Sequence, residues 1–181
     1  MRLFHFSDDE RIARFEPRPV RTPAVRPPGR DWLNGPLVWA IEEDWQAMYL
    51  FPRDCPRILL RRKPTTTAAD LERWWGSRDA PMIAHIEWGW FERFRTGRLA
   101  RYELPAAAFE GLGDAGMWVA REAVEPVGVE IIDDLPAALA ALGVELRLMP
   151  TLAPLRGVWD TSLHASGVRL RNASGGWEGA P

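Results

Sequence analysis

The chain has 181 residues, which is long enough for one domain with a sizeable hydrophobic core. Its 23 basic and 25 acidic side chains give a net charge of -2, so no overall positive field favours a nucleic acid as partner. The sequence has no apolar run of membrane-spanning length and no signal-peptide pattern, and we therefore expect a cytoplasmic protein. The single Cys55 excludes an intrachain disulfide framework and a multi-cysteine zinc site.

The first third of the chain predicts short elements around a long proline-rich loop. A strand is expected at 1–6, and Ser7-Asp8-Asp9-Glu10 is a helix-start signal that predicts a short helix at 8–13. Many prolines with interspersed arginines indicate an extended loop. The loop and the elements after it are expected at 17–36 (loop), 37–41 (strand), 42–50 (helix) and 51–57 (stiff connector).

Short strands and short helices continue through the rest of the chain. Strands are expected at 58–62, 81–87, 99–104, 117–120, 127–132, 144–149 and 168–170. Helices are expected at 67–75, 90–95, 105–109, 135–142 and 152–164. A regular strand–helix–strand rhythm is missing, which favours a mixed α+β class. We expect one α+β domain over 1–173 and a disordered tail over 174–181.

A histidine between two phenylalanines stands out in the first strand. Alternate strand residues face opposite ways, so His5 shares a face with Leu3 and Ser7, while Phe4 and Phe6 share the other. A polar ring is therefore carried into an apolar setting. His5 is either a structural histidine with its hydrogen bonds satisfied or part of a site.

Common motifs of catalytic sites are missing from the sequence. There is no Walker loop, dinucleotide-binding glycine motif, esterase elbow or zincin motif. The three histidines, His5, His85 and His164, are far apart and have no metal-ligand spacing. We therefore predict no metal site. His164 is expected near the negative end of the helix predicted at 152–164.

The connector at 51–57 is the most specific short stretch. Two prolines restrict its backbone, which suits the aiming of side chains. Arg53 and Arg57 are suited to present planar guanidinium groups to a diphosphate or a carboxylate. Alternatively, Arg53 pairs with Asp54 and pins the loop. Cys55 has no base near it in the sequence and is expected to be a buried small apolar residue.

Several motifs together resemble an uncharacterised family of small bacterial proteins, and they cover nearly the whole chain. They are Leu3-Phe4-His5-Phe6-Ser7, Phe15-Glu16-Pro17-Arg18, Leu37-Val38-Trp39-Ala40-Ile41, Tyr49-Leu50-Phe51-Pro52-Arg53-Asp54-Cys55-Pro56-Arg57, Arg101-Tyr102-Glu103-Leu104-Pro105 and Trp118-Val119-Ala120-Arg121-Glu122.

A looser resemblance concerns function. The aromatic-His-aromatic-Ser strand, the Phe-x-Pro segment at 15–17 and the strand at 38–41 followed by a helix look like the opening of ADP-ribosyltransferase-like domains of the His-Tyr-acid type. The resemblance implies bent or split mixed β-sheets with short helices. It also implies NAD as a substrate, cleavage of the nicotinamide–ribose bond, and a nucleotide rather than a metal as the bound group. The acceptor is not assigned.

The resemblance assigns roles residue by residue. His5 would hold the nicotinamide ribose, and Tyr49 or Trp39 would stack on nicotinamide. Arg53 would contact the diphosphate, and Glu122 would stabilise an oxocarbenium-like transition state. The remaining residues of the expected cleft are Ser7 and Trp118.

The strand predicted at 117–120 differs from that of ADP-ribosyltransferase-like domains in the position of its acidic residue. Gly116 and Met117 stand before Trp118, where such domains often carry a glutamate, and Glu122 follows four residues after Trp118. Two alternatives to the transferase therefore stay open. One is a non-catalytic nucleotide- or partner-binding module of the same fold. The other is a small nucleotide hydrolase that uses His5 as an acid or base near neutral pH.

Overall fold

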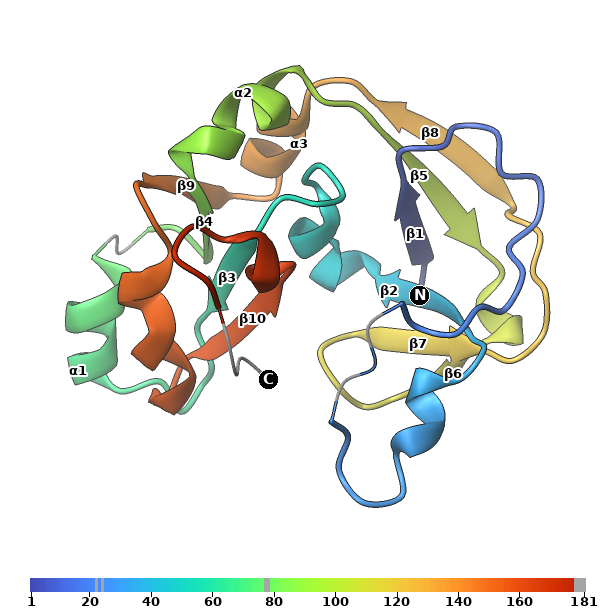
Figure 1. Ribbon diagram of the computed structural model, residues 1–181, viewed down its shortest axis with the longest axis horizontal. Coiled ribbons are helices and arrows are strands. Elements are labelled where there is room, and N and C mark those ends of the chain that lie inside the picture. The colour runs from blue at the N-terminus through green and yellow to red at the C-terminus, as the bar shows by residue number, and fades with distance from the viewer. Residues whose placement is uncertain (22, 24, 77–78, 178–181) are drawn as a thin grey trace. The chain divides into compact units, whose positions relative to one another are not determined.

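A computed structural model of the chain describes residues 1–21, 23, 25–76 and 79–177 and confirms the α+β class (Figure 1). The chain builds two compact units from discontinuous segments. Unit 1 contains Met1–Gln46 and Leu99–Ile132, and unit 2 contains Ala47–Arg98 and the described residues from Asp133 onward. No glycine- or serine-rich linker marks the points where the chain passes from one unit to the other, so the sequence carried no signal for this division.

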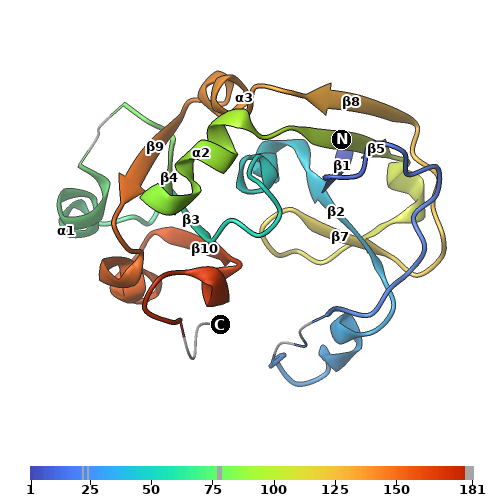
Figure 2. The same ribbon diagram turned by 45° about the horizontal axis from the view of Figure 1, so that its top comes forward.

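Unit 1 is organised around one antiparallel sheet. Within its described residues, six strands lie in the order β6–β7–β2–β1–β5–β8. Figure 2 shows β7, β2, β1, β5 and β8, and β6 is labelled in Figure 1. Their bounds are β1 (Leu3–Ser7), β2 (Val38–Glu42), β5 (Leu99–Leu104), β6 (Glu110–Gly111), β7 (Met117–Ala120) and β8 (Gly128–Ile132). The short 3-10 helices η1 (Asp31–Asn34) and η4 (Ala106–Ala108) lie in the connections.

Both faces of the central strand β1 are buried. Leu3, fully buried, belongs to a hydrophobic cluster on one face that also contains Val38, Ala40 and Tyr102. On the other face, the Phe4 ring lies between two guanidinium groups. Arg2 is 4.8 Å and Arg101 is 4.7 Å from its centre. Alternation along one strand therefore separates an apolar face from a charged one.

Unit 2 contains a mixed sheet. Its four strands within the described residues lie in the order β10–β3–β4–β9, with β4 and β9 parallel and the other pairs antiparallel. Their bounds are β3 (Arg57–Arg61), β4 (Met82–Glu87), β9 (Val144–Met149) and β10 (His164–Val168). The helices are η2 (Glu43–Tyr49, entering from unit 1), α1 (Ala68–Asp70), the π-helix η3 (Leu71–Trp75), α2 (Trp88–Thr96), α3 (Leu135–Ala141), η5 (Ala153–Asp160) and η6 (Leu170–Asn172).

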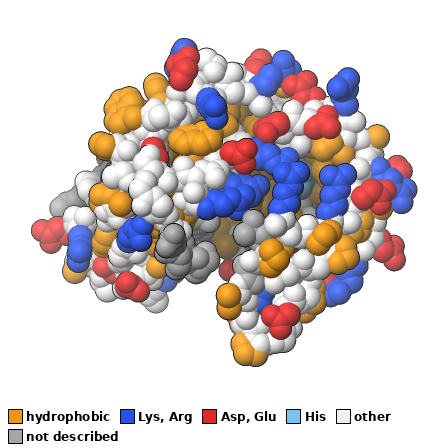
Figure 3. All heavy atoms as spheres, viewed as in Figure 1, with side chains coloured by type: hydrophobic (Ala, Val, Ile, Leu, Met, Phe, Trp, Pro, Cys, Tyr) orange, Lys and Arg blue, Asp and Glu red, His pale blue; other side chains and the backbone are white. Residues whose placement is uncertain are grey.

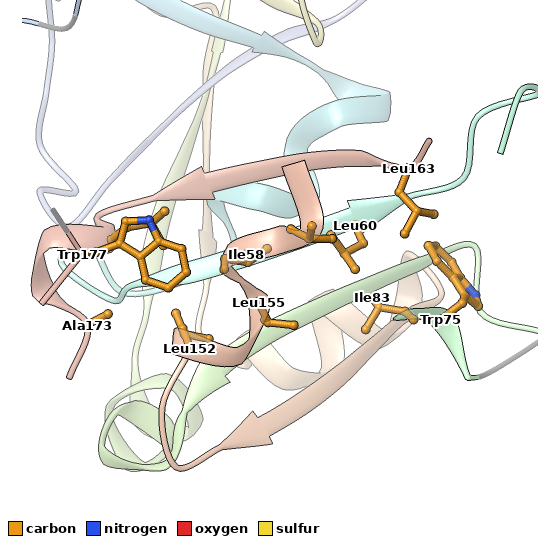
Figure 4. Packing of buried hydrophobic residues seen from close by; sticks show 11 residues of the cluster. Ile58, Leu60, Trp75, Ile83, Leu152, Leu155, Leu163, Ala173 and Trp177 are labelled. Carbon is orange, nitrogen blue, oxygen red and sulfur yellow. The ribbon is translucent and has the colours of Figure 1, made fainter. Parts of the chain in front are cut away.

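The core of unit 2 lies between its sheet and the segments around η5. Figure 4 shows Ile58 and Leu60 of β3 and Ile83 of β4 packing toward Leu152 and Leu155. Burial of these aliphatic side chains is the main favourable contribution to the stability of this unit.

The C-terminal segment is anchored to unit 2, whereas the sequence predicted a disordered tail from residue 174. Trp177 is 9% exposed and belongs to the core of unit 2. The Glu87 carboxylate, 3% exposed, accepts hydrogen bonds from the backbone N–H of Leu152 at 3.0 Å, and from the N–H of Ser174 at 3.0 Å and its hydroxyl at 2.9 Å. Residues 178–181 of the predicted tail lie outside the described residues.

The helix predicted at 8–13 is wrong, and the helix predicted at 152–164 is shorter than expected. Residues 8–13 form no helix, since the Tyr102 hydroxyl donates to the Asp9 carbonyl at 2.7 Å and holds this segment against the sheet. The helix predicted at 152–164 ends at Asp160. His164 is therefore the first residue of β10 rather than a residue at a helix end.

We expect the substitution Glu87→Gln to destabilise the protein by about 2 kcal/mol. The NH₂ group of the glutamine would face backbone N–H groups that now donate hydrogen bonds to the carboxylate. Urea unfolding of the full chain measures this change. The matched control is Glu92→Gln on α2, since Glu92 is exposed and forms a surface ion pair with Arg95 one helical turn away. An unfolding midpoint of Glu87→Gln equal to that of the control would contradict the anchoring role.

Candidate functional site

His5 lies where the pairing between β1 and β2 ends. The last paired residues are Phe4 and Ile41. One residue further, the His5 Nδ1 lies 2.8 Å from the carbonyl oxygen of Trp39. A carbonyl oxygen only accepts, so Nδ1 bears the hydrogen and donates it. In the neutral ring, Nε2 is therefore the nitrogen with a lone pair, suited to accept a hydrogen bond or a proton.

The apolar surroundings of His5 fix the plane of its ring. The Phe15 ring centre lies 4.7 Å from the imidazole centre, and Phe15 in turn contacts the Tyr102 ring edge-on at 5.2 Å. Phe15 is held in place by two backbone hydrogen bonds to Val124, at 2.8 and 2.9 Å. His5 thus combines a structural hydrogen bond with a defined orientation.

Ser7 has a local structural contact. Its side chain is 6% exposed, and its hydroxyl oxygen accepts a hydrogen bond from the N–H of Asp9 at 3.1 Å. Ser7 thereby forms the turn after β1, on the same face of the strand as His5.

The two tryptophans of the predicted cleft lie on opposite faces of the sheet. Trp118 packs with the cluster that contains Ala40, its partner across β2 and β7. The Trp39 side chain belongs to the other face, with Leu37 and Val119. The buried indole Nε1 of Trp39 has no hydrogen-bond acceptor within the described residues.

A carboxylate that sequence reasoning missed is paired with Trp118. The Trp118 Nε1 donates to Glu42 Oε1 at 2.7 Å. Glu42 ends β2, and only the pairing of β2 with β7 brings it to Trp118. A glutamate at the end of a predicted strand was the available sequence signal, but the partner strand cannot be read from it.

Glu122 lies beyond the end of β7 and lines an open hollow of about 410 Å³ in unit 1. The apolar lining includes Phe109, Val119 and Val124, and the charged lining includes Arg121, which pairs with Glu110 at 2.8 Å. Within the described part of the chain, the exposed Glu122 carboxylate makes no hydrogen bond or ion pair. It is thus a carboxylate available to a bound molecule.

Tyr49 and Arg53 belong to unit 2, whereas the other predicted site residues belong to unit 1. Tyr49 ends η2, and its burial raises the pKa of the hydroxyl group. Arg53 is exposed in the connector at 51–57. Unit 1 therefore carries His5, Ser7 and Trp118 on one face of its sheet, and Glu122 follows two residues after the end of β7.

Cys55 is buried, as expected, and burial raises the pKa of its thiol to about 12, so the group is neutral near pH 7.

Among the described residues, no group of three or more His, Cys, Asp or Glu side chains is arranged to hold a metal ion. No helix in residues 1–21, 23, 25–76 and 79–177 is long and apolar enough to cross a membrane. Figure 3 shows acidic and basic side chains interspersed on the visible face.

His85 and His164 lie on opposite faces of the unit 2 sheet. His85 pairs with Ile58, which faces the core, and is 2% exposed. His164 pairs with Arg61, three residues further along β3, and so faces the other way. The Nε2 of His164 lies 2.9 Å from the hydroxyl of Ser166. The two histidines therefore do not converge on one site.

Comparisons with known proteins identify a family without an assigned activity. The sequence model of a "Family of unknown function (DUF6886)" matches residues 4–173 of the chain. No curated protein and no solved structure matches it.

We expect His85 to make the protein less stable in acid. Burial lowers the His85 pKa from 6.5 to about 4, so the unfolded chain binds a proton that the folded chain excludes. The stability contributed by neutral His85 is complete above pH 6.5 and is lost as the pH falls from 6.5 to 4, by about 3 kcal/mol in all.

Urea unfolding at several pH values measures this loss. His85→Leu removes the titrating group and should show a smaller decrease in stability across the same interval. His164→Gln is the control and should retain the decrease. If the free energy of unfolding decreased equally with falling pH in the wild type and in His85→Leu, His85 would not be the cause of the decrease.

Proposed function

We propose that this chain, which belongs to the family of unknown function DUF6886, binds NAD through unit 1 and cleaves the bond between nicotinamide and ribose. Nicotinamide leaves, and the ribose carbon forms its new bond to water or to another nucleophilic acceptor. The observation that carries the proposal is the hydrogen bond from His5 Nδ1 to the Trp39 carbonyl. It leaves Nε2 as the accepting nitrogen of the neutral ring, which suits a ribose hydroxyl as donor.

Glu122 supports the proposed chemistry. Cleavage of the nicotinamide–ribose bond passes through an oxocarbenium-like state, which a nearby carboxylate stabilises. The Glu122 carboxylate has no protein partner within the described residues and lines a hollow large enough for part of a nucleotide. Glu122 is thus the carboxylate we assign to this role. The roles that the resemblance gives to Tyr49 and Arg53 stay predictions.

A second candidate function is a binding module without turnover. It is favoured by the hydrogen bond between Trp118 and Glu42, because the carboxylate next to this tryptophan is already engaged by the protein. Such a module would bind the nucleotide through His5 and would release no nicotinamide.

Two substitutions of His5 separate its structural from its binding role. His5→Asn retains an N–H near the position of Nδ1 and should keep the bond to Trp39, while it removes the acceptor at Nε2. We expect this variant to retain its unfolding temperature and to bind NAD at least about tenfold more weakly. His5→Gln, which lacks the donor near Nδ1, should instead unfold at a lower temperature.

Calorimetric titration with NAD and thermal unfolding measure the two effects. Undiminished NAD affinity in a folded His5→Asn variant would contradict the assigned role of His5. Absence of NAD binding by the wild type would contradict the proposed function as a whole.

We expect Glu122→Gln to abolish nicotinamide release and to leave the affinity for NAD within about twofold, because the carboxylate acts mainly in the transition state. Nicotinamide release and NAD binding are measured in the same samples. Glu125→Gln is the matched control, since Glu125 is exposed and its contact with Arg14 is weak. That contact is a surface ion pair at the long distance of 3.8 Å. NAD binding without release in the wild type would favour the binding module.

A further inference from the structure

Unit 2 contains a buried arginine without an acidic partner. Arg57, the first residue of β3, is 3% exposed. Its Nε donates to the Met48 carbonyl at 2.7 Å, and its Nη1 donates to the Cys55 carbonyl at 2.9 Å. Within the part of the chain that the structure describes, no carboxylate contacts the guanidinium, and Nη2 makes no hydrogen bond.

The neighbours of Arg57 do not neutralise its charge. Tyr49 and Cys55 interact electrostatically with it, but burial raises the pKa of both groups, so both are neutral near pH 7. Burial also lowers the pKa of Arg57, to about 10, at which it still carries its charge near pH 7. The Phe51 ring, 5.4 Å away, and two carbonyl dipoles offer partial compensation only. A buried cation in such a setting is costly unless an anion accompanies it.

A second arginine lies at the same end of the sheet. Val168, the last residue of β10, pairs with Arg57, and Arg169 follows directly. The charge of Arg169 lowers the pKa of Arg57. Arg169 has φ of 57°, a left-handed conformation that is rare for residues other than glycine. The sequence predicted a strand at 168–170, whereas the turn at Arg169 brings a second positive charge toward that of Arg57.

The connector at 51–57 adds a third cation. Arg169 Nε donates to the Arg53 carbonyl at 3.2 Å, which joins the connector to the residue after β10. Asp54 lies 3.8 Å from Arg169 but is 65% exposed, so its charge is largely screened. The exposed Arg53 side chain has no partner within the described residues.

We propose that Arg57 and Arg169, with Arg53 beside them, form a binding site for the phosphate group of a soluble phosphate compound. Guanidinium groups offer forked N–H donors that match phosphate oxygens, and the Arg57 Nη2 donor is not used by the protein. A bound phosphate group would bring a negative charge to Arg57, whose guanidinium no carboxylate contacts within the described residues. The site lies within unit 2 and does not depend on the proposed function of unit 1.

A purely structural role for Arg57 makes a different prediction. If Arg57 serves only to hold the Met48 and Cys55 carbonyls, its removal lowers stability and no anion affects unfolding specifically. Substitution of Arg57 itself therefore does not separate the two roles. The decisive variants are Arg169→Gly and Arg53→Gln, because glycine readily adopts the backbone of residue 169 and Arg53 is exposed.

The test is thermal unfolding of the full chain with inorganic pyrophosphate, with ADP, and with sodium chloride at matched ionic strength. A ligand that binds only the folded state raises the unfolding temperature with its concentration. We expect pyrophosphate to do so beyond the salt control. Both variants should weaken this effect by about tenfold in apparent affinity, while Arg93→Gln on α2 behaves as the wild type.

The outcomes distinguish the source of the phosphate and the two proposals. Tighter binding of ADP than of pyrophosphate would assign the site to a nucleotide, and the reverse order to a free phosphate compound. His5→Asn should leave the pyrophosphate effect unchanged whether or not it binds NAD. The proposal would be overturned if pyrophosphate raised the unfolding temperature no more than sodium chloride does. It would also be overturned if pyrophosphate raised the unfolding temperature equally in the wild type, Arg169→Gly and Arg53→Gln.

Discussion

Unit 1 depends on the hydrogen bond between His5 and the Trp39 carbonyl. β1 lies between β2 and β5 in its sheet, with Leu3 and Phe4 fully buried on opposite faces, and it separates from β2 after Phe4. The imidazole supplies a donor at the point where backbone pairing stops. A structural role and a chemical role for His5 are therefore compatible, because they use different nitrogens of one ring.

Unit 2 also contains side chains that bind backbone groups outside the strand pairings. Arg57 binds carbonyls of the segment before β3, and Arg147 of β9 binds the Trp74 and Trp75 carbonyls. Glu87 provides the converse contact, with N–H groups as donors to its carboxylate. Charged side chains thus satisfy backbone groups that the sheet leaves unpaired. The difference among them is that the Arg57 Nη2 nitrogen makes no hydrogen bond within the described residues and lies beside other cations.

The sequence predicted correctly those strands that are marked by the residues within and next to them. The strands at 99–104, 117–120 and 144–149 have the predicted bounds, the last of them after Gly143 in a left-handed turn. β10 was missed because His-Ala-Ser-Gly-Val has weak strand propensity and forms a strand through its pairing with β3. In the same way, no local pattern indicated the contact of Glu42 with Trp118 or the separation of Tyr49 from His5 into different units.

The order of the segments along the chain has a consequence for synthesis on the ribosome. The sheet of unit 1 is complete only when β8 has been made, at residue 132, and the sheet of unit 2 only when β10 has been made, at residue 168. β1 finds β2 early, but its second partner, β5, follows about a hundred residues later. The early strands of both units therefore stay without part of their pairing during much of synthesis, which exposes them to chaperones.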